Sequence, residues 1–568
     1  MPNESMSLAR TIIALPFLTA LASASVAQDL TETRRLTAFD SMIDDTFSTS
    51  LSVDGGIVAV GAHRTDDDGF GSGSVYLMYA TTGETIAKVR PANPFALHSF
   101  GYDVALAGNT LVAGARQAGA TNGPGAAYIF EPVGGVWTQR AKLVGSDPQL
   151  DFFGTSVAIS GDTVVVGAHL YPVGTELDAG AAYVFTGGGS SWTEQAKLTA
   201  SDASSSDYFG VSVGASGDTV AVGAANAVFA SSGSAGAVYI FGRFGSTWTQ
   251  RAKLTASDGV LEDRFGHSIA LQGDTLLVGA FENDANGLDE AGAAYVFTRS
   301  GSTWTERAKL VASDAAAGDQ FGFSVALDGD RAVIGARYRN DNIGFPDHGA
   351  AYVFEGSGST WTQTATLIAS NGNLNDHLGW DVTIDGDTAI AGAPDTGNNA
   401  DRGIAYVYDL DQNGGPYCFG NGYGTPCPCG ADGGPREGCA NSAGAGGASL
   451  DASGTASISN DTFWLNATGV PSNKPGLLLR GANVVNAGLG NPAGDGLLCT
   501  AGTTARSQVQ IAAGGATTFT DFQGSPFGAS SYGAGNAAHY QFWYRDTSNP
   551  CSGAGFNFSN AWLVNWTL

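Results

Sequence analysis

The chain has 568 residues, of which 82 are glycine and only 14% are charged, a composition that favours tight turns and sheet over long helices. Its 26 Lys and Arg residues against 53 Asp and Glu residues give a formal net charge of −27. No basic cluster could neutralise phosphates, so the composition excludes nucleic acid as a partner and suits an extracellular protein kept soluble by its carboxylates.

The N-terminus has the pattern of an export signal. Arg10 precedes an apolar run over residues 11–24, and residues 25–27 are small. The run is too short to span a membrane comfortably, and Pro16 interrupts it. Residues 1–27 are therefore predicted to be a signal peptide. This predicts a secreted or cell-surface protein without a membrane span in the mature chain.

A sevenfold repeat fills the central part of the chain, and its most complete copy runs from Phe321 to Phe354. Each copy carries a Gly-Ala dipeptide 14 residues after its first residue, and the copies begin 53 to 57 residues apart. A period of this length built from strand-like runs indicates a propeller, a solenoid or an array. The first residues of the copies are Phe47, Phe100, Phe153, Phe209, Phe265, Phe321 and Leu378.

Within one copy the apolar runs predict four strands. Residues 324–327 and 332–334 flank a Gly-Asp turn, which is a hairpin signal. Residues 349–354 predict a third strand, and residues 361–367 predict a fourth after a Gly-Ser-Thr turn. Four antiparallel strands in each copy predict the blade of a β-propeller.

The two ends of the repeat region predict how the ring closes. The last copy has no fourth strand after residues 406–408, whereas residues 33–38 match the register of fourth strands such as 304–310. An N-terminal strand that completes the last blade would close the ring and remove its free edges. The prediction is an all-β chain with a closed seven-bladed β-propeller over residues 30–411.

These motifs resemble the FG-GAP repeat family, whose repeats build the integrin α-subunit propeller and occur in many secreted bacterial proteins. The match covers roughly Leu30 to Leu410. The resemblance implies a propeller that binds partners or ligands outside the cell and is seldom an enzyme. Integrin-like copies carry a calcium loop, Asp-x-Asp-x-Asp-Gly-x-x-Asp, but this chain has only short turns there, such as residues 328–330. Because so short a turn cannot supply seven oxygens, no cofactor is predicted to be required, and Ca²⁺ is left as an option elsewhere.

The connections between the second and third strands of each blade are the predicted recognition loops. A four-stranded meander places the strand 2–3 and strand 4–1 connections on one face, the loop face, and the tight turns on the other. The 2–3 connections vary in length and content, which is typical of recognition loops on a constant scaffold. The candidate ligand-binding residues are Arg64, Asp66, Asp68, His169, Tyr171, Phe281, Glu282, Arg337, Tyr338 and His348.

One of these loops, residues 283–290, is rich in carboxylates and amides and looks like a fragment of a calcium loop. Its spacing matches no full motif, and solvated Asn/Asp loops are common, so a solvated loop is the favoured interpretation and a cation site the alternative. The candidate metal ligands are Asp284, Asn286, Asp289 and Glu290.

The C-terminal part of the chain differs from the repeats in composition. Residues 412–447 form a Gly/Pro/Cys-rich linker, and residues 448–568 contain short strand-like runs such as 539–546, which predict a small β-sandwich-like domain. An even number of cysteines behind an export signal predicts disulfides. Zinc is less favoured because Cys427 and Cys429 are too close for its usual spacing and no histidine is near. The disulfide candidates are Cys418, Cys427, Cys429, Cys439, Cys499 and Cys551.

Catalysis finds little support in the sequence, which has only seven histidines and none of the common nucleophile, zinc or phosphate-loop motifs. The favoured hypothesis is a secreted or cell-surface, non-catalytic binding or adhesion protein with an extracellular protein or glycan as its partner. The first alternative is a structural component of the cell surface. The second is an extracellular hydrolase or lyase with a site on the propeller face.

Overall fold

The computed structural model describes residues 28–410 apart from residues 118–123, 148–150, 229–232, 341–346, 373 and 397–401. Beyond residue 410 it describes only separate strands. The proposed signal peptide at residues 1–27 and all six cysteines lie outside the described residues. The signal peptide and the disulfides therefore stay predictions.

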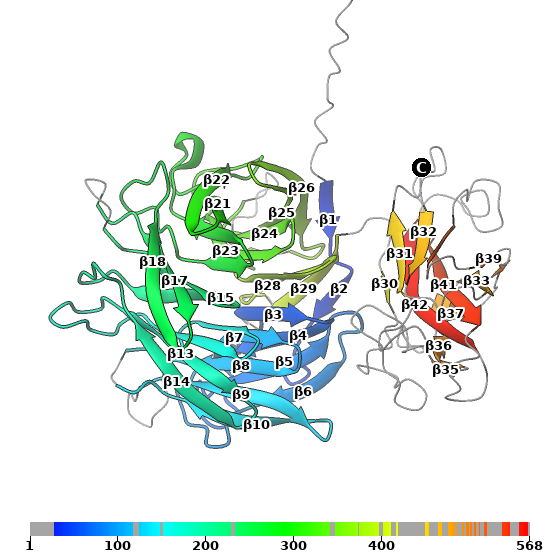
Figure 1. Ribbon diagram of the computed structural model, residues 1–568, viewed down its shortest axis with the longest axis horizontal. Coiled ribbons are helices and arrows are strands. Elements are labelled where there is room, and N and C mark those ends of the chain that lie inside the picture. The colour runs from blue at the N-terminus through cyan, green and yellow to red at the C-terminus, as the bar shows by residue number, and fades with distance from the viewer. Residues whose placement is uncertain are drawn as a thin grey trace, which may run out of the picture.

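Seven separate sheets of at least four strands form the blades of a propeller (Figure 1). Blade 1 contains β3 (Ser50–Asp54), β4 (Ile57–Ala62), β5 (Ser74–Tyr79) and β6 (Thr85–Val89). Blade 2 contains β7 (Phe100–Ala107), β8 (Thr110–Ala115), β9 (Ala126–Val133) and β10 (Val136–Leu143). Blade 3 contains β11 (Val157–Ser160), β12 (Thr163–Ala168), β13 (Ala181–Gly188) and β14 (Ser191–Leu198).

The remaining blades repeat this order. Blade 4 contains β15 (Phe209–Ser216), β16 (Thr219–Ala224), β17 (Ala237–Phe244) and β18 (Thr247–Leu254). Blade 5 contains β19 (Ile269–Gln272), β20 (Thr275–Ala280), β21 (Ala293–Ser300) and β22 (Thr303–Leu310), with the short 3-10 helix η1 (Ala285–Gly287) in its 2–3 loop. Blade 6 contains β23 (Phe321–Asp328), β24 (Arg331–Ala336), β25 (Ala350–Ser357) and β26 (Thr360–Ile368). Blade 7 contains β27 (Val382–Asp385), β28 (Thr388–Ala393) and β29 (Ile404–Asp409).

The N-terminal segment closes the ring, as predicted. Strand β2 (Arg34–Leu36) pairs antiparallel with β29 and is the fourth strand of blade 7. A further strand, β1 (Gln28–Thr31), pairs in parallel with β26 and gives blade 6 a fifth strand, which the sequence did not predict. In Figure 1 the dark-blue strands β1 and β2 lie beside the last strands of the repeat region. The N-terminus thus ties together the two blades next to the closure.

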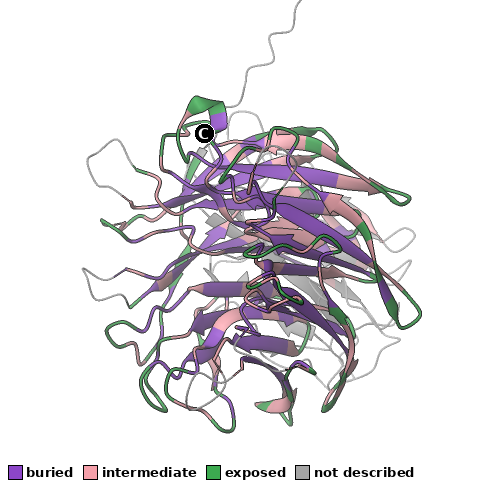
Figure 2. Cartoon of the chain, turned by 90° about the vertical axis from the view of Figure 1, so that its left-hand side faces the viewer, coloured by how far each residue is buried: buried purple, intermediate pink, exposed green. Residues whose placement is uncertain are grey.

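The hydrophobic core lies between neighbouring blades. In the layer between blades 5 and 6, Leu277 and Val296 of blade 5 pack with Phe321, Ile334 and Tyr352 of blade 6. These side chains are at most 1% exposed, and the rings of Phe321 and Tyr352 meet edge-on with centroids 5.5 Å apart. Similar layers recur at the other joints. Figure 2 shows the result, with buried strands and exposed colour concentrated in the connecting loops.

The two signature dipeptides meet at these joints. A Cβ atom on Gly335, in the Gly-Ala dipeptide of blade 6, would lie 2.1 Å from the carbonyl oxygen of Gly379 in blade 7. At the closure a Cβ atom on Gly392 would lie 2.3 Å from the carbonyl oxygen of Ser48 in blade 1. Only glycine permits so close a contact between backbones. The repeated glycines therefore lie where the backbone of one blade contacts that of the next.

The described C-terminal residues form strands only. The largest sheet has the order β30-β42-β41-β33-β38, with β39 also paired to β33, and a three-stranded sheet has the order β31-β32-β40. Two further pairs are β34-β37 and β35-β36. The bounds of the longer strands are β31 (Ser449–Ser453), β32 (Trp464–Thr468), β33 (Pro475–Gly481), β41 (Ala537–Arg545) and β42 (Phe556–Asn565). The shorter strands are β30 (Pro416–Tyr417), β34 (Asn483–Val484), β35 (Asn491–Ala493), β36 (Gly496–Leu498), β37 (Thr500–Ala501), β38 (Ala505–Arg506), β39 (Gln510–Ile511) and β40 (Thr517–Phe519). The sandwich-like packing of this region stays a prediction.

Candidate functional site

The loop face is built by hydrogen bonds between consecutive connections. The 2–3 loop of one blade accepts backbone hydrogen bonds from the connection that leads into the next blade. Ser206 N donates to Leu177 O at 2.8 Å, and Gln320 N donates to Glu290 O at 3.1 Å. Because each loop is tied to its neighbour, side chains from different blades are held in fixed positions around the propeller axis.

At the centre of this face, aromatic, histidine and arginine side chains form a belt that we call the axial ring. In blades 1 to 4 its members touch in sequence. Thr49 Oγ1 lies 3.0 Å from His63 Nδ1, the His63 and Tyr102 rings are 5.3 Å apart, and the Arg116 guanidinium lies 4.3 Å from the Tyr102 ring. The contacts continue through Phe152, His169 and Tyr208.

Polar contacts carry the belt from blade 4 into blade 5. The Arg264 guanidinium donates hydrogen bonds to Asn226 and, at 2.9 Å, to Glu282. The His267 ring then contacts both Phe281 and Phe323, with centroid distances of 4.6 and 4.8 Å. These contacts link blades 4, 5 and 6 without a gap.

Arg337 is the centre of the part of the axial ring that belongs to blades 6 and 7. Its guanidinium carbon lies 3.6 Å from the Phe323 ring centroid and 4.9 Å from that of Trp380. Its Nε donates to Gln320 Oε1 at 3.0 Å. Burial lowers the pKa of Arg337 from its usual value. The stacking fixes the plane of a half-buried cation.

His377 and Tyr338 complete this part of the ring. Their rings meet edge-on at 5.1 Å, and His377 Nδ1 lies 2.5 Å from Asp395 Oδ2. The Tyr338 ring also lies 4.5 Å from the Arg337 guanidinium. Side chains from every blade thus contribute to the axial ring.

Three half-buried histidines of the ring, His63, His169 and His267, carry no charge at neutral pH. Burial, with a further contribution from nearby arginines, lowers the pKa of His63 and of His267 to about 3. The same causes lower the pKa of His169 to about 4. These three histidines therefore add no positive charge to the ring.

The structure brings several of the predicted site residues into this ring and places others in supporting roles. His169, Phe281, Glu282, Arg337 and Tyr338 belong to the axial ring. Arg64 is exposed beside it, and His348 is half-buried in the 2–3 loop of blade 6.

The other predicted ligand residues hold their own loops together. Asp66 accepts a hydrogen bond from Gly71 N at 2.7 Å, and Asp68 pairs with Arg90 at 2.8 Å. Tyr171 is 6% exposed, and its hydroxyl donates to Asp147 and accepts from Lys197. These contacts stabilise the loops that form the loop face.

The predicted cation loop has an internal structure of its own. The Asp284 carboxylate accepts a hydrogen bond from Glu290 N at 3.1 Å, and Asn286 adopts a left-handed conformation with φ of 58°. Asp289 is exposed, and Glu290 accepts from Gln320 Nε2 at 3.3 Å. Across the described residues, no three His, Cys, Asp or Glu side chains converge in a way that could hold a metal.

Sequence reasoning missed Tyr102, Arg116, Phe152, His267 and Trp380, which stand in the axial ring. A signal for part of this set exists. The residue two places after the start of each repeat varies widely while its neighbours stay constant. It is Thr49, Tyr102, Thr155, Val211, His267, Phe323 and Trp380 in the seven copies.

The next residue along the strand forms a second ring, which we call the joint ring and which is made of Ser50, Asp103, Ser156, Ser212, Ser268, Ser324 and Asp381. Ser156, Ser212 and Ser268 each donate a hydrogen bond to a carbonyl of the next blade. Asp103 instead accepts from Ser50 Oγ and Val157 N.

Asp381 makes the corresponding contacts at the closure, where it accepts from Ser324 Oγ and Leu51 N, both at 2.6 Å. Burial raises the pKa of Asp103 to about 6. Burial and the charge of Asp103 raise the pKa of Asp381 to about 7. Both oxygens of each carboxylate are engaged, so these groups fasten the blades.

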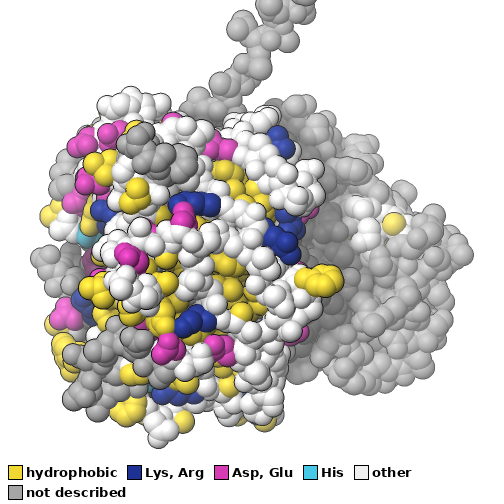
Figure 3. Space-filling view, turned by 60° about the vertical axis from the view of Figure 1, so that its left-hand side comes forward, with side chains coloured by type: hydrophobic (Ala, Val, Ile, Leu, Met, Phe, Trp, Pro, Cys, Tyr) yellow, Lys and Arg dark blue, Asp and Glu magenta, His cyan; other side chains and the backbone are white. Residues whose placement is uncertain are grey.

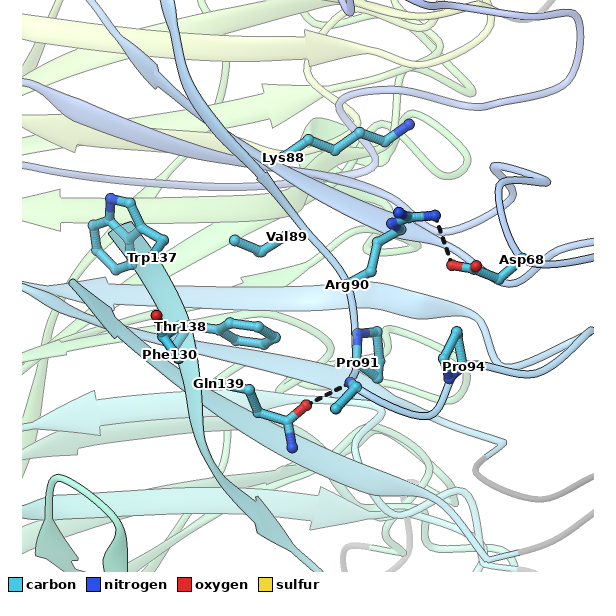
Figure 4. A pocket seen from close by; sticks show the side chains of 11 residues that line it. Asp68, Lys88, Val89, Arg90, Pro91, Pro94, Phe130, Trp137, Thr138 and Gln139 are labelled. Carbon is cyan, nitrogen blue, oxygen red and sulfur yellow. Dashed lines mark hydrogen bonds and ion pairs between the residues drawn. The ribbon is translucent and has the colours of Figure 1, made fainter. Parts of the chain in front are cut away.

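A groove of about 570 Å³ lies at the outer edge of the propeller between β6 and β10 (Figure 4). Phe130 and Trp137 line it together with Pro91. Its two cations are paired, Arg90 with Asp68 at 2.8 Å and Lys88 with Asp40 and Asp67. Its charges are therefore balanced, in contrast to those of the axial ring.

The FG-GAP repeat family matches seven segments of the chain, which together cover more than half of its length. They are residues 30–78, 85–130, 137–185, 192–241, 248–297, 304–354 and 361–408. With seven blades observed as well, the chain belongs to the FG-GAP repeat family. Each family repeat begins in or near the outermost strand of one blade and ends in the third strand of the next, which explains why the N-terminal strand falls in blade 7.

A search of curated proteins found no match to the chain. Among the residues with a described structure, no helix is long and apolar enough to cross a membrane.

Proposed function

We propose that the protein is a non-catalytic binding or adhesion module that acts outside the cell and contacts a protein partner through its loop face. The observation that carries this proposal is where the exposed apolar side chains lie. Among the described residues, fourteen large apolar side chains are exposed, and eleven of them stand on the loop face. They are Phe39, Met42, Ile43, Phe70, Leu97, Val144, Leu177, Val228, Val260, Leu261 and Leu374.

The opposite face offers only Val133, Val136 and Phe244 within the described chain. Apolar side chains gathered on one face commonly mark an interaction surface, because covering them releases their hydration water. On the part of the surface that Figure 3 shows, apolar side chains lie among acidic and basic ones. Such a mixture suits a protein partner, since typical interfaces combine apolar and polar contacts.

The best-defined pair on this face is Phe70 and Leu97. Phe70 is 74% exposed and Leu97 is 51% exposed. Leu97 N donates to Phe70 O at 2.6 Å, so the loops of blades 1 and 2 present the two side chains together. Because this backbone hydrogen bond orders the two loops before a partner binds, less conformational entropy is lost on binding.

The test uses the mature chain, residues 28–568, on arrays of extracellular proteins and glycans. Phe70→Asp is expected to weaken binding at least tenfold, because an interface anchor is replaced by a charge. Phe244→Asp is the matched control, since Phe244 is 84% exposed on the opposite face, and its binding should equal that of the wild type.

An equal loss in both variants would reject the loop face as the contact surface. Failure of the mature chain to bind any component of either array would favour the structural alternative. Binding to glycans alone would reject the protein partner.

A further inference from the structure

Arg116 and Arg337 of the axial ring stand out from the other arginines of the propeller. The remaining arginines of the described propeller pair with carboxylates or are exposed to solvent. The paired residues are Arg35, Arg90, Arg140, Arg243, Arg264, Arg299, Arg331 and Arg339. The exposed residues without an ion pair are Arg34, Arg64, Arg251, Arg307 and Arg402.

Arg116 and Arg337 are half-buried, and neither has an ion-pair partner among the described residues. Asp395 and Glu282 attract Arg337 without forming an ion pair with it. A partly dehydrated cation without a direct ion pair is unfavourable unless something else compensates it. In a chain with a net charge of −27, carboxylates to pair with are plentiful. The missing partner is therefore a specific feature of this face.

Aromatic stacking holds these cations while leaving their outer hydrogen-bond donors available. Arg337 stacks on Phe323 and Trp380, and only its Nε has a hydrogen-bond acceptor within the described chain. Arg116 stacks on Tyr102 and Phe152, and its buried Nε has no acceptor there. A guanidinium held flat in this way presents a planar pair of N–H donors.

The acidic groups within the ring already have partners. Glu282 pairs with Arg264 at 2.9 Å, and Asp395 contacts His377 at 2.5 Å. The uncharged histidines add no further positive charge. The axial ring holds three arginines, Arg116, Arg264 and Arg337, against these two carboxylates, which leaves a small excess of positive charge. This cationic centre is walled by aromatic rings and lies on the face that also carries the exposed apolar side chains.

We propose that this centre receives an aspartate or glutamate side chain of the protein partner, with the carboxylate on the guanidinium group of Arg337 and with Arg116 adding to the positive charge of the ring. Planar guanidinium and carboxylate groups match in two-point hydrogen bonds. The surrounding aromatic rings accommodate the apolar neighbours of the acidic residue. A peptide segment fits better than an acidic glycan because apolar side chains surround the ring on the same face. This inference rests on the proposed function.

The test selects binders from a phage-displayed peptide library on the mature chain. Selected peptides are expected to share an acidic residue, and replacing that residue by its amide should weaken binding roughly tenfold to a hundredfold. The same replacement should have little effect on the Arg337→Gln variant, because the guanidinium group that the carboxylate contacts is already absent from it. Arg299→Gln is the matched control, since Arg299 pairs with Asp274 at 2.6 Å away from the ring.

Two controls separate this inference from the proposed function. Arg337→Lys keeps the charge but not the planar donor pair, so it should restore only part of the binding. If peptides bind and Phe70→Asp abolishes their binding while Arg337→Gln does not, the acidic-residue site is rejected and the loop-face function stands. If oligouronates bind in an Arg337-dependent way and no peptide does, the occupant is an acidic glycan, and both the peptide and the protein partner are rejected.

Discussion

Two rings of side chains lie one residue apart on the innermost strands and have opposite characters. Ser324 belongs to the joint ring, where nearly every copy of the repeat places a serine that fastens one blade to the next. Its neighbour Phe323 belongs to the axial ring and stands at a position where no aromatic or charged residue occurs twice among the seven copies. Two consecutive residues of one strand thus have different roles, one in the scaffold and one in the recognition face.

The comparison shows how a repeat protein can specialise without losing its fold. Joints depend on backbone contacts and small residues, which hold the strands whatever stands at the adjacent position. The axial ring can therefore differ in every blade. Changes at joint positions should mainly alter stability, whereas changes in the axial ring should mainly alter binding.

The largest effect is expected at a glycine of a joint. Gly335→Ala places a Cβ atom 2.1 Å from the Gly379 carbonyl oxygen, so the two blades must separate. We expect a loss of about 4 kcal/mol in the free energy of unfolding, or a failure to yield soluble protein. Gly329→Ala is the control, because its turn has a φ of 60° but open space around it, and it should cost about 1 kcal/mol. Urea unfolding measures the free energy of unfolding of both variants. An equal loss in both would contradict a steric clash between the blades as the cause.

The ring closure should respond almost as strongly. Leu36 of β2 is fully buried between blades 7 and 1, so Leu36→Ala is expected to cost about 3 kcal/mol. The exposed Arg34→Ala in the same strand should change stability by less than about 0.5 kcal/mol. If thermal melting shows the two variants to be equally stable, β2 does not close the ring.

A smaller effect is expected from the two carboxylates of the joint ring. The pKa values of Asp103 and Asp381 rise to about 6 and about 7 in the folded protein, so the folded state keeps protons that the unfolded chain releases. The free energy of unfolding should therefore fall as pH rises from about 4 to about 7. We expect a fall of roughly 2 kcal/mol, less than the full pKa shifts would give, because both side chains are only half-buried and solvent screens their charges. Asp103→Asn with Asp381→Asn should make the slope shallower. An unchanged slope in unfolding titrations would assign the pH dependence to other groups.

The propeller could be predicted from the sequence because its joints repeat. Phe321, Gly335 and their counterparts stand in register in nearly every copy, so the blades, their number and the closing strand followed from spacing alone. Strand β1 escaped prediction because parallel pairing with β26 leaves no repeated pattern in four residues.

The axial ring was predicted only in part. The 2–3 loops pointed to Arg337 and His169, but Trp380 and Tyr102 lie within the repeat, in or next to strands that looked like scaffold. Their contacts with Arg337 and His63 cross between blades over 43 and 39 residues of sequence, which a single sequence does not reveal. The unpaired state of Arg116 is likewise a property of the folded chain.

The measurement that tests the central claim most directly is a paired one, on Arg337→Gln in the axial ring and Ser268→Ala in the joint ring. For each variant of the mature chain, binding of a selected acidic peptide and the free energy of unfolding are determined together. Ser268→Ala removes a hydrogen bond to Gly322 O, so it should lose about 1 kcal/mol of stability and keep its affinity. Arg337→Gln should lose affinity while its stability changes by less than about 1 kcal/mol. The reverse pattern would contradict the division between scaffold and recognition.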